Sequence, residues 1–181
     1  MIVLLNGPFG VGKSTTARLL AARLPGAVVY DPEWIGFVLR RLPLYRAADY
    51  QDLRLWRRLA VWGAWLARRA LRRHLIVPLA VLRRDAIAEL TAGFRRADPD
   101  ARCLRLAASA ETLRDRILTS GDRVARRWRL AHMAAGLAAA DPAFGLEIST
   151  EGRTPAEVAE AIARLLRRDR AIHRPWACDA W

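Results

Sequence analysis

The fold is decided by the stretch Ile2-Val3-Leu4-Leu5-Asn6-Gly7-Pro8-Phe9-Gly10-Val11-Gly12-Lys13-Ser14. Its last eight residues match the pattern G-x-x-x-x-G-K-[ST], in which a glycine-rich turn between a strand and a helix wraps around phosphate groups. The apolar run 2–5 supplies the strand, and a helical pattern that begins at Lys13 supplies the helix. We therefore expect this turn to bind a nucleoside triphosphate, either ATP or GTP.

Lys13 is the single lysine of the chain, and all the other basic residues apart from histidine are arginine. A compact ammonium group on a flexible stem suits a phosphate-binding turn better than the planar fork of arginine. The motif predicts that Lys13 reaches the β- and γ-phosphates and that the Ser14 hydroxyl holds Mg²⁺. Backbone N–H groups of the turn complete the expected nucleotide site, which comprises Gly7, Pro8, Phe9, Gly10, Val11, Gly12, Lys13, Ser14 and Thr15.

Length and composition indicate one globular domain, since the chain has 181 residues of which 53% are hydrophobic. No apolar run approaches the ~20 residues of a membrane-spanning helix, and the start of the chain has no signal-peptide pattern. Cys103 falls in a predicted strand and Cys178 in the tail, which favours free thiols and a cytoplasmic location. No cysteine–histidine cluster suited to zinc is found in the sequence.

The formal net charge of +13 favours anionic partners such as nucleic acid or an acidic lipid surface. The arginines, however, occur in pairs on helical patterns, for example Arg57-Arg58 and Arg68-Arg69, and this is typical of solvated helix faces. We therefore expect a small-molecule substrate, no nucleic-acid partner and no membrane span; peripheral contact with a membrane stays open as the less favoured alternative. The protein is expected to be a monomer or a homodimer.

Strand patterns alternate with helical patterns along the chain. The strands are expected at 2–5, 27–30, 75–77, 103–106 and 144–149, and the helices at 13–24, 33–41, 52–73, 85–97, 110–119, 127–140 and from 155. This alternation predicts a five-stranded parallel sheet between two helical layers, a three-layer α/β/α fold. One domain is expected over 1–168, followed by a tail over 169–181.

Asp31 follows the second predicted strand, at the same sheet edge as the glycine-rich turn. A carboxylate there can take the proton of a substrate hydroxyl as the hydroxyl attacks the γ-phosphate. The alternative is that Asp31 caps the helix that begins at Pro32 and Glu33. We favour the role of base for Asp31, with Glu33 as the reserve candidate.

A group of arginines surrounds the break Ser120-Gly121-Asp122. Arginines on a mobile segment can close over a transferring phosphoryl group, so residues 120–128 are expected to form a lid. The alternative is one more solvated run of arginines. The glycine break favours the lid, in which Arg123 and Arg127 are catalytic candidates and Arg126 is a third lid arginine; Arg116 and Arg129 flank the group.

Tryptophans gather between the second and third predicted strands. We expect Trp34 and Trp56 to face a substrate pocket, and Trp62 and Trp65, three residues apart, to lie in the core. The third strand ends in Val77-Pro78-Leu79 and lacks the acidic residue of a motor-type nucleotide hydrolase, which favours a small kinase.

Several stretches together resemble the tunicamycin-resistance protein family, whose more distant kin include chloramphenicol phosphotransferase, shikimate and gluconate kinases, and adenylate kinase. The resemblance covers roughly residues 1–165. It is carried by Asn6 and the octet after it, Val29-Tyr30-Asp31-Pro32-Glu33, Gly36-Phe37, Leu39-Arg40, Leu55-Trp56-Arg57, Leu75-Ile76-Val77-Pro78, Glu111-Thr112-Leu113 and Trp128. It implies a nucleoside-monophosphate-kinase-like P-loop fold, an ATP site and a role in resistance to a nucleoside-type antibiotic.

The resemblance also implies roles for single residues. In the phosphotransferase relatives the aspartate after the second strand is the base, and Asp31 holds that position. In adenylate-kinase-like proteins an arginine at the start of the lid stacks on adenine, and Arg116 is similarly placed. A second arginine expected four residues later is Ser120 here, so the lid chemistry would rest on Arg123, Arg126 or Arg127. The expected substrate pocket comprises Asp31, Glu33, Trp34, Arg40 and Trp56.

These features predict a Mg²⁺-dependent phosphotransferase that acts on a hydroxyl of a nucleoside-like or sugar-containing antibiotic. Two alternatives remain open from the sequence. One is a metabolic nucleoside or nucleotide kinase, and the other is a resistance protein that binds ATP and sequesters the drug without catalysis.

Overall fold

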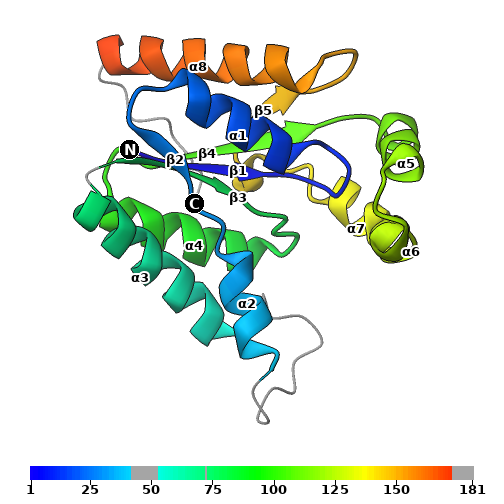
Figure 1. Cartoon of the computed structure of the whole chain (residues 1–181), viewed down its shortest axis with the longest axis horizontal. Coiled ribbons are helices and arrows are strands. Elements are labelled where there is room, and N and C mark those ends of the chain that lie inside the picture. The colour runs from blue at the N-terminus through cyan, green and yellow to red at the C-terminus, as the bar shows by residue number, and fades with distance from the viewer. Residues whose placement is uncertain (42–52, 72, 173–181) are drawn as a thin grey trace.

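A five-stranded, wholly parallel sheet forms the centre of the molecule in the computed structural model, which describes residues 1–41, 53–71 and 73–172 (Figure 1). The strand order is β2-β3-β1-β4-β5. Their bounds are β1 Ile2–Asn6, β2 Ala27–Val29, β3 His74–Pro78, β4 Arg102–Ala107 and β5 Leu146–Ser149. The predicted α/β fold with a five-stranded parallel sheet is confirmed.

Helices cover both faces of the sheet. Helices α1 (Lys13–Arg23) and α8 (Pro155–Ile172) lie on one face, and α3 (Arg54–Leu71) and α4 (Arg84–Ala97) lie on the other (Figure 1). The remaining helices, α2 (Glu33–Leu39), α5 (Ala110–Thr119), α6 (Arg123–Ala131) and α7 (Met133–Ala138), lie near the edge where the strands end. A short 3-10 helix, η2 (Pro142–Phe144), precedes β5. The three-layer arrangement places the glycine-rich turn at that edge.

Strand β1 is buried on both faces, which explains its uninterrupted apolar sequence. Ile2 and Leu4 belong to the core under α3 and α4, whereas Val3 and Leu5 belong to the core under α1 and α8. Pairing of β1 with both β3 and β4 leaves it at the centre of the sheet. The glycine-rich turn therefore starts from the central, fully buried strand of the sheet.

The lid segment differs from the prediction. In place of one helix over 127–140, α6 begins at Arg123 and α7 follows at Met133. The helix starts early because the Asp122 side chain accepts a hydrogen bond from the N–H of Ala125 (3.1 Å) and caps the first turn. The candidate lid arginines consequently lie on a helix.

The burial of α3 corrects two predictions. Trp62 and Trp65 were expected in the core but are exposed, while the expected solvent-facing arginines Arg57 and Arg68 point inward. Arg57 is buried and forms an ion pair with Glu89 of α4 (2.6 Å). Helix α3 turns its small residues and Trp56 toward the sheet, and this rotation carries Trp62 and Trp65 to its outer face.

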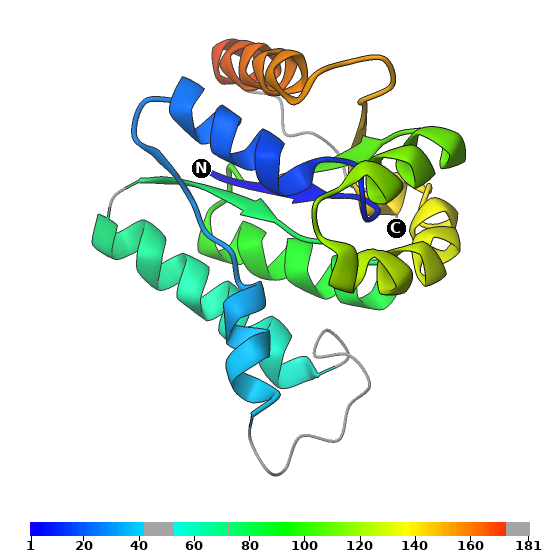
Figure 2. The ribbon, with the colours of Figure 1, turned by 45° about the vertical axis from the view of Figure 1, so that its right-hand side comes forward.

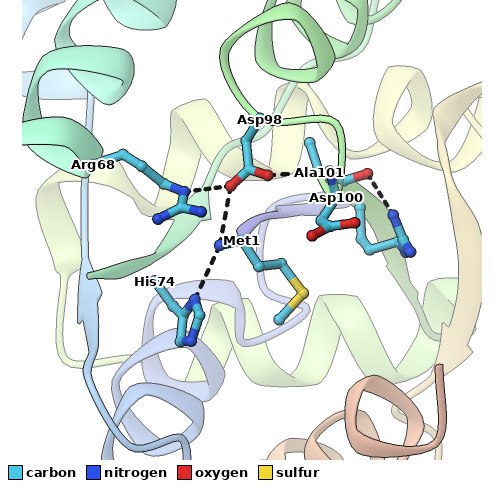
Figure 3. A network of polar contacts seen from close by, with 7 residues as sticks. Met1, Arg68, His74, Asp98, Asp100 and Ala101 are labelled. Carbon is cyan, nitrogen blue, oxygen red and sulfur yellow. Dashed lines mark hydrogen bonds and ion pairs between the residues drawn. The ribbon is translucent and has the colours of Figure 1, made fainter. Parts of the chain in front are cut away.

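A polar network closes the edge of the sheet opposite the glycine-rich turn (Figure 3). The buried carboxylate of Asp98, after α4, accepts hydrogen bonds from Arg68 of α3 and from the N–H of Asp100 (3.0 Å), and it pairs with the amino group of Met1 (3.0 Å). That amino group also contacts Nδ1 of His74 (2.9 Å). Burial alone would raise the pKa of Asp98, but the bonds from Arg68 and Met1 hold this pKa below its usual range.

Candidate active site

The glycine-rich turn has the backbone shape that its sequence predicts. Gly10 and Gly12 take positive φ angles of 83° and 94°, a region that favours glycine. A Cβ atom on Gly10 would also lie 2.8 Å from the side chain of Ile117. Asn6 fixes the start of the turn, because its amide accepts from the N–H of Val81 (2.9 Å) and donates to the carbonyl of Val81 (3.2 Å). The turn is thus anchored to both the sheet and helix α5.

Lys13 lies inside this turn. Its Nζ donates to the carbonyls of Gly7 and Pro8, both at 2.8 Å, and sits 5.4 Å from the centre of the Phe9 ring. Burial lowers the pKa of Lys13 to about 8, while the charge of Glu33 acts to raise it and that of Arg129 acts to lower it. A half-buried ammonium group that is held by two carbonyls, with no carboxylate bonded to it among the described residues, is suited to receive an anion.

Ser14 and Thr15 lie exposed in the first turn of α1, the positive end of the helix dipole. Within residues 1–41, 53–71 and 73–172, no group of three or more histidine, cysteine, aspartate or glutamate side chains is placed to hold a metal ion. A metal in this site would therefore rely on the Ser14 hydroxyl and on phosphate oxygens. This donor set fits Mg²⁺, which usually keeps few protein ligands and binds with substrate phosphates.

Asp31 and Glu33 follow β2 at the same edge of the sheet. The Oδ1 atom of Asp31 accepts a hydrogen bond from the N–H of Glu33 (2.9 Å), so Asp31 makes a capping contact to the start of α2, although Pro32 and not Asp31 occupies the N-cap position. The Asp31 side chain is nevertheless exposed, and one bond to Oδ1 leaves Oδ2 able to accept a proton. Glu33 is half-buried, and its carboxylate is the one whose charge acts on Lys13.

The expected substrate pocket is only partly brought together. Trp34 is exposed on α2 beside the two carboxylates, and Arg40 is exposed at the end of that helix. The structure differs from the expectation for Trp56, which is fully buried and donates from Nε1 to the carbonyl of Pro32 (3.1 Å). Trp56 therefore supports the chain just before Glu33 and does not present its ring to a ligand.

Helix α6 lies beside the glycine-rich turn, as Figure 2 shows. Trp128 packs edge-on against Phe9 of the turn (ring centres 4.8 Å apart) and stacks on His132 (4.2 Å). Arg129, the next residue along α6, is held by Asp122 (2.8 Å), and its charge reaches Lys13.

The three arginines predicted for the lid are placed differently. Arg123 and Arg127 are exposed, and Arg126 donates to the carbonyl of Ser120 (3.0 Å). Sequence reasoning placed Arg129 among the arginines around the break but did not select it for the lid, although its position next to Trp128, within the family resemblance, was a usable signal.

Arg116 joins helix α5 to the loop after β5. Its two terminal nitrogens donate to the hydroxyl and the carbonyl of Thr150, both at 2.9 Å. Thr150 is buried and its N–H donates to the carbonyl of Ala107 (2.7 Å), at the end of β4. Sequence reasoning missed Thr150, whose place directly after the fifth strand was the available signal. These contacts position Arg116 at the edge of the sheet that carries the glycine-rich turn.

Comparison with known proteins supports this description of the fold. No curated protein sequence matches the chain. Among solved structures, the tunicamycin resistance protein of Deinococcus radiodurans is 27% identical, with a TM-score of 0.72, 92% of this chain covered and 95% of that chain. A sugar kinase from Janibacter sp. HTCC2649 is 21% identical (TM-score 0.68, 94% and 96% covered). The Mycobacterium tuberculosis APS kinase CysC in complex with AMPPNP and APS is also 21% identical (TM-score 0.68, 92% and 96% covered).

These neighbours confirm the resemblance to the tunicamycin-resistance family and the P-loop kinase fold. The model of the AAA domain family AAA_33 matches residues 2–142, which is well over half of the chain and includes the glycine-rich turn, the two carboxylates and α6. The chain therefore belongs to the AAA domain family AAA_33.

Proposed function

We propose that this protein transfers the γ-phosphoryl group of ATP or GTP to a hydroxyl of a small molecule, a nucleoside-like or sugar-containing antibiotic. The observation that carries the proposal is the convergence of opposite charges on one edge of the sheet. Lys13 in the turn, the carboxylates Asp31 and Glu33 after β2, and Arg129 on α6 come from three separate segments. A site that only held a nucleotide would not require a carboxylate whose charge acts on its lysine, as that of Glu33 does here.

In the proposed reaction Asp31 accepts the proton of the substrate hydroxyl, and the hydroxyl oxygen bonds to the γ-phosphorus. The bond from that phosphorus to the β–γ bridging oxygen breaks, and its electron pair stays on the leaving diphosphate. Lys13 neutralises the β- and γ-phosphates, and Arg129 of α6 stabilises the charge on the transferring group. Mg²⁺ on Ser14 and the phosphates would supply further positive charge.

Glu33 is the second carboxylate of the proposed site. Because its charge acts on Lys13, we assign it to holding that ammonium group in place and, where Asp31 is replaced, to serving as a weaker base. Trp34, exposed on the same helix, is the proposed aromatic contact for the sugar or base of the substrate.

The antibiotic class of substrate is inferred from the 27% identical tunicamycin resistance protein. One observation favours a second candidate, sequestration of the drug without transfer: the capping bond from Glu33 engages Asp31, the proposed base. The two candidates share the nucleotide site and differ in whether phosphate is transferred.

The test is incubation of the purified protein with γ-labelled ATP or GTP, Mg²⁺ and a panel of nucleoside-like and sugar-containing antibiotics, with simple nucleosides as controls. The proposal expects label on an antibiotic and none on the control nucleosides. Label on a nucleoside alone would show a metabolic nucleoside kinase. Tight drug binding with no labelled product would show sequestration.

A further inference from the structure

The outer face of α3 carries a combination of side chains that the proposed kinase activity does not use. The helix, Arg54–Leu71, contains five arginines and no acidic residue. Two tryptophans are exposed on it, Trp62 at 58% and Trp65 at 40%, next to exposed Leu55 (56%) and Leu66 (44%). At 100° per residue these four apolar side chains and three arginines, Arg54, Arg58 and Arg69, fall on one side of the helix. We call this set of seven residues the outer face of α3.

Among the described residues, no carboxylate is paired with the arginines of this face. Within the part of the chain that the structure describes, the guanidinium groups of Arg54, Arg58 and Arg96 form no hydrogen bond or ion pair. Arg69 lies over the ring of Trp65, 5.8 Å from its centre. By contrast, the inward arginines of the same helix are paired, Arg57 with Glu89 and Arg68 with Asp98. The outer face therefore presents positive charge that a partner can neutralise.

The face continues into the seam between α3 and α4. A hollow of about 310 Å³ there is lined by Arg58, Trp62 and Trp65 from α3 and by Arg96 and Gly93 from α4, together with Glu89, whose carboxylate is paired with Arg57. Gly93 permits the close approach of the two helices, because a Cβ on it would lie 2.6 Å from Val61. The seam adds Arg96 to the positive charge of the outer face, and it sets the indole rings of Trp62 and Trp65 between arginines.

Three partners can be compared for this surface. A second copy of the chain would bring the arginines of two outer faces together. Because α3 has no acidic residue, these like charges would repel one another. A single-stranded nucleic acid would use the arginines and tryptophans, but exposed leucines offer it nothing. An anionic bilayer uses all three kinds of side chain: arginine binds the headgroups, tryptophan occupies the interface, and leucine enters the acyl boundary.

We propose that the outer face of α3, with Arg96 of α4, docks the protein on an anionic lipid surface. The helix would lie in the plane of the interface and would not cross it. This agrees with the absence, among the described residues, of any helix long and apolar enough to span a bilayer. The docking face and the candidate active site are separate surfaces, so the inference does not depend on the proposed function.

The test is sedimentation of the full chain with vesicles of phosphatidylcholine alone or mixed with phosphatidylserine, at increasing salt. Binding should require phosphatidylserine and weaken with salt. Each arginine near an anionic surface contributes about fivefold to partitioning, so Arg58→Gln with Arg69→Gln should weaken binding by about 10- to 30-fold. The matched control, Arg164→Gln with Arg168→Gln on α8, removes the same charge from the opposite face of the sheet and should change binding by less than about threefold.

A second measurement tests whether Trp62 and Trp65 are the tryptophans that contact the lipid. Brominated phosphatidylcholine in the anionic vesicles should quench the fluorescence of the wild type, and Trp62→Ser with Trp65→Ser should lose most of that quenching. Thermal unfolding checks that this variant is folded; the arginine variants supply the answer if it is not. Equal binding to neutral vesicles, or equal loss in the α8 control, would overturn the proposal. Stronger binding to a single-stranded oligonucleotide than to the vesicles would also overturn it. The same holds if the wild type is a dimer and Trp62→Ser with Trp65→Ser makes it a monomer.

Discussion

The glycine-rich turn and helix α3 both concentrate positive charge, but they do so in opposite ways. In the turn a single ammonium group, Lys13, is half-buried and held by the carbonyls of Gly7 and Pro8. On α3 neighbouring arginines point in different directions: Arg57 and Arg68 form ion pairs inside, whereas Arg58 and Arg69 remain outside. Position relative to the rest of the fold, and not residue type, decides what each charge does.

Charge in the turn is arranged for a ligand, whereas the inward charges of α3 are arranged for the fold. Burial lowers the pKa of Lys13 to about 8, so without an anion the charged form of this residue is less stable than it would be in water. Arg68 instead meets the carboxylate of Asp98, which Met1 also contacts. Mutations in the two regions should therefore separate activity from stability.

Replacing Lys13 with Met should produce the largest effect. We expect turnover to fall by about 10³–10⁵-fold, the scale of removing a cation that faces the transferring phosphoryl group. The fold should be retained or stabilised at neutral pH, because the buried charge is removed. Between about pH 8 and 10.5 the unfolded wild-type chain binds more protons than the folded protein, so wild-type stability should rise with pH there, and that of Lys13→Met should not. Activity assays and urea unfolding measure both; retained turnover would remove the phosphate-site assignment.

Replacing Asp31 with Asn distinguishes the base from the helix cap. Asparagine caps helices about as well as aspartate, so the bond from the N–H of Glu33 and the stability should be kept. Loss of the base should lower turnover by about 10²–10⁴-fold while nucleotide affinity is preserved. Glu33→Gln is the matched control and should weaken turnover less. A rate for Asp31→Asn within a few-fold of wild type would transfer the base role to Glu33.

The turn could be predicted from the sequence, whereas the orientation of α3 could not. The turn, β1 and α1 form one continuous stretch, so the motif predicted the strand, the glycine conformations and the place of Lys13 from local geometry. The rotation of α3 depends on partners far along the chain, Glu89 and Asp98, which no local pattern reveals. The predictions for Trp56 and for Trp62 with Trp65 came out reversed for this reason.

The lid shows an intermediate case. The sequence located its arginines and the break before them, but it did not reveal that Asp122 would cap a helix from Arg123. Once α6 forms, only residues on its inner side can approach the turn, and these include Trp128 and Arg129. The closure of this segment on a bound nucleotide remains a prediction.

Replacing Arg129 with Ala tests that inner side. Its charge reaches Lys13, so we expect turnover to fall by about 10²-fold, with a smaller effect on nucleotide binding because phosphoryl charge is best met in the transition state. Arg127→Ala, an exposed neighbour on the same helix, should change turnover by less than about threefold. Steady-state kinetics and nucleotide titration give both values. The reverse order would return the catalytic role to the arginines first chosen from the sequence.

Replacing the inward-facing Arg68 of α3 should change the stability of the protein and leave its turnover unchanged. Arg68→Ala leaves the buried carboxylate of Asp98 with one cation fewer and should lower the free energy of unfolding by about 2 kcal/mol, whereas Arg69→Ala should change it by less than about 0.5 kcal/mol. The pKa of Asp98 is lowered in the fold, so this stabilisation is present above the unfolded pKa of about 3.9 and is lost as pH falls through the folded value. Urea unfolding at neutral and acid pH should therefore show the Arg68→Ala difference shrinking in acid; two variants of equal stability would refute the pairing.

The smallest effect is a proton taken up when nucleotide binds. In the free protein Lys13 has a pKa of about 8, so at pH 8.5 roughly a quarter of the molecules carry the ammonium form. Phosphate oxygens beside Nζ favour that form and raise the pKa, so binding at pH 8.5 should take up as much as ~0.7 proton, and binding at pH 6.5 almost none. Calorimetric titration in buffers of different ionisation enthalpy measures this number directly. Lys13→Met should abolish the uptake, whereas Arg58→Gln on α3 should leave it unchanged. If Lys13→Met still took up a proton on nucleotide binding, another titratable group near the turn would bind that proton. Lys13 would then not be the group whose charge is arranged for the phosphates.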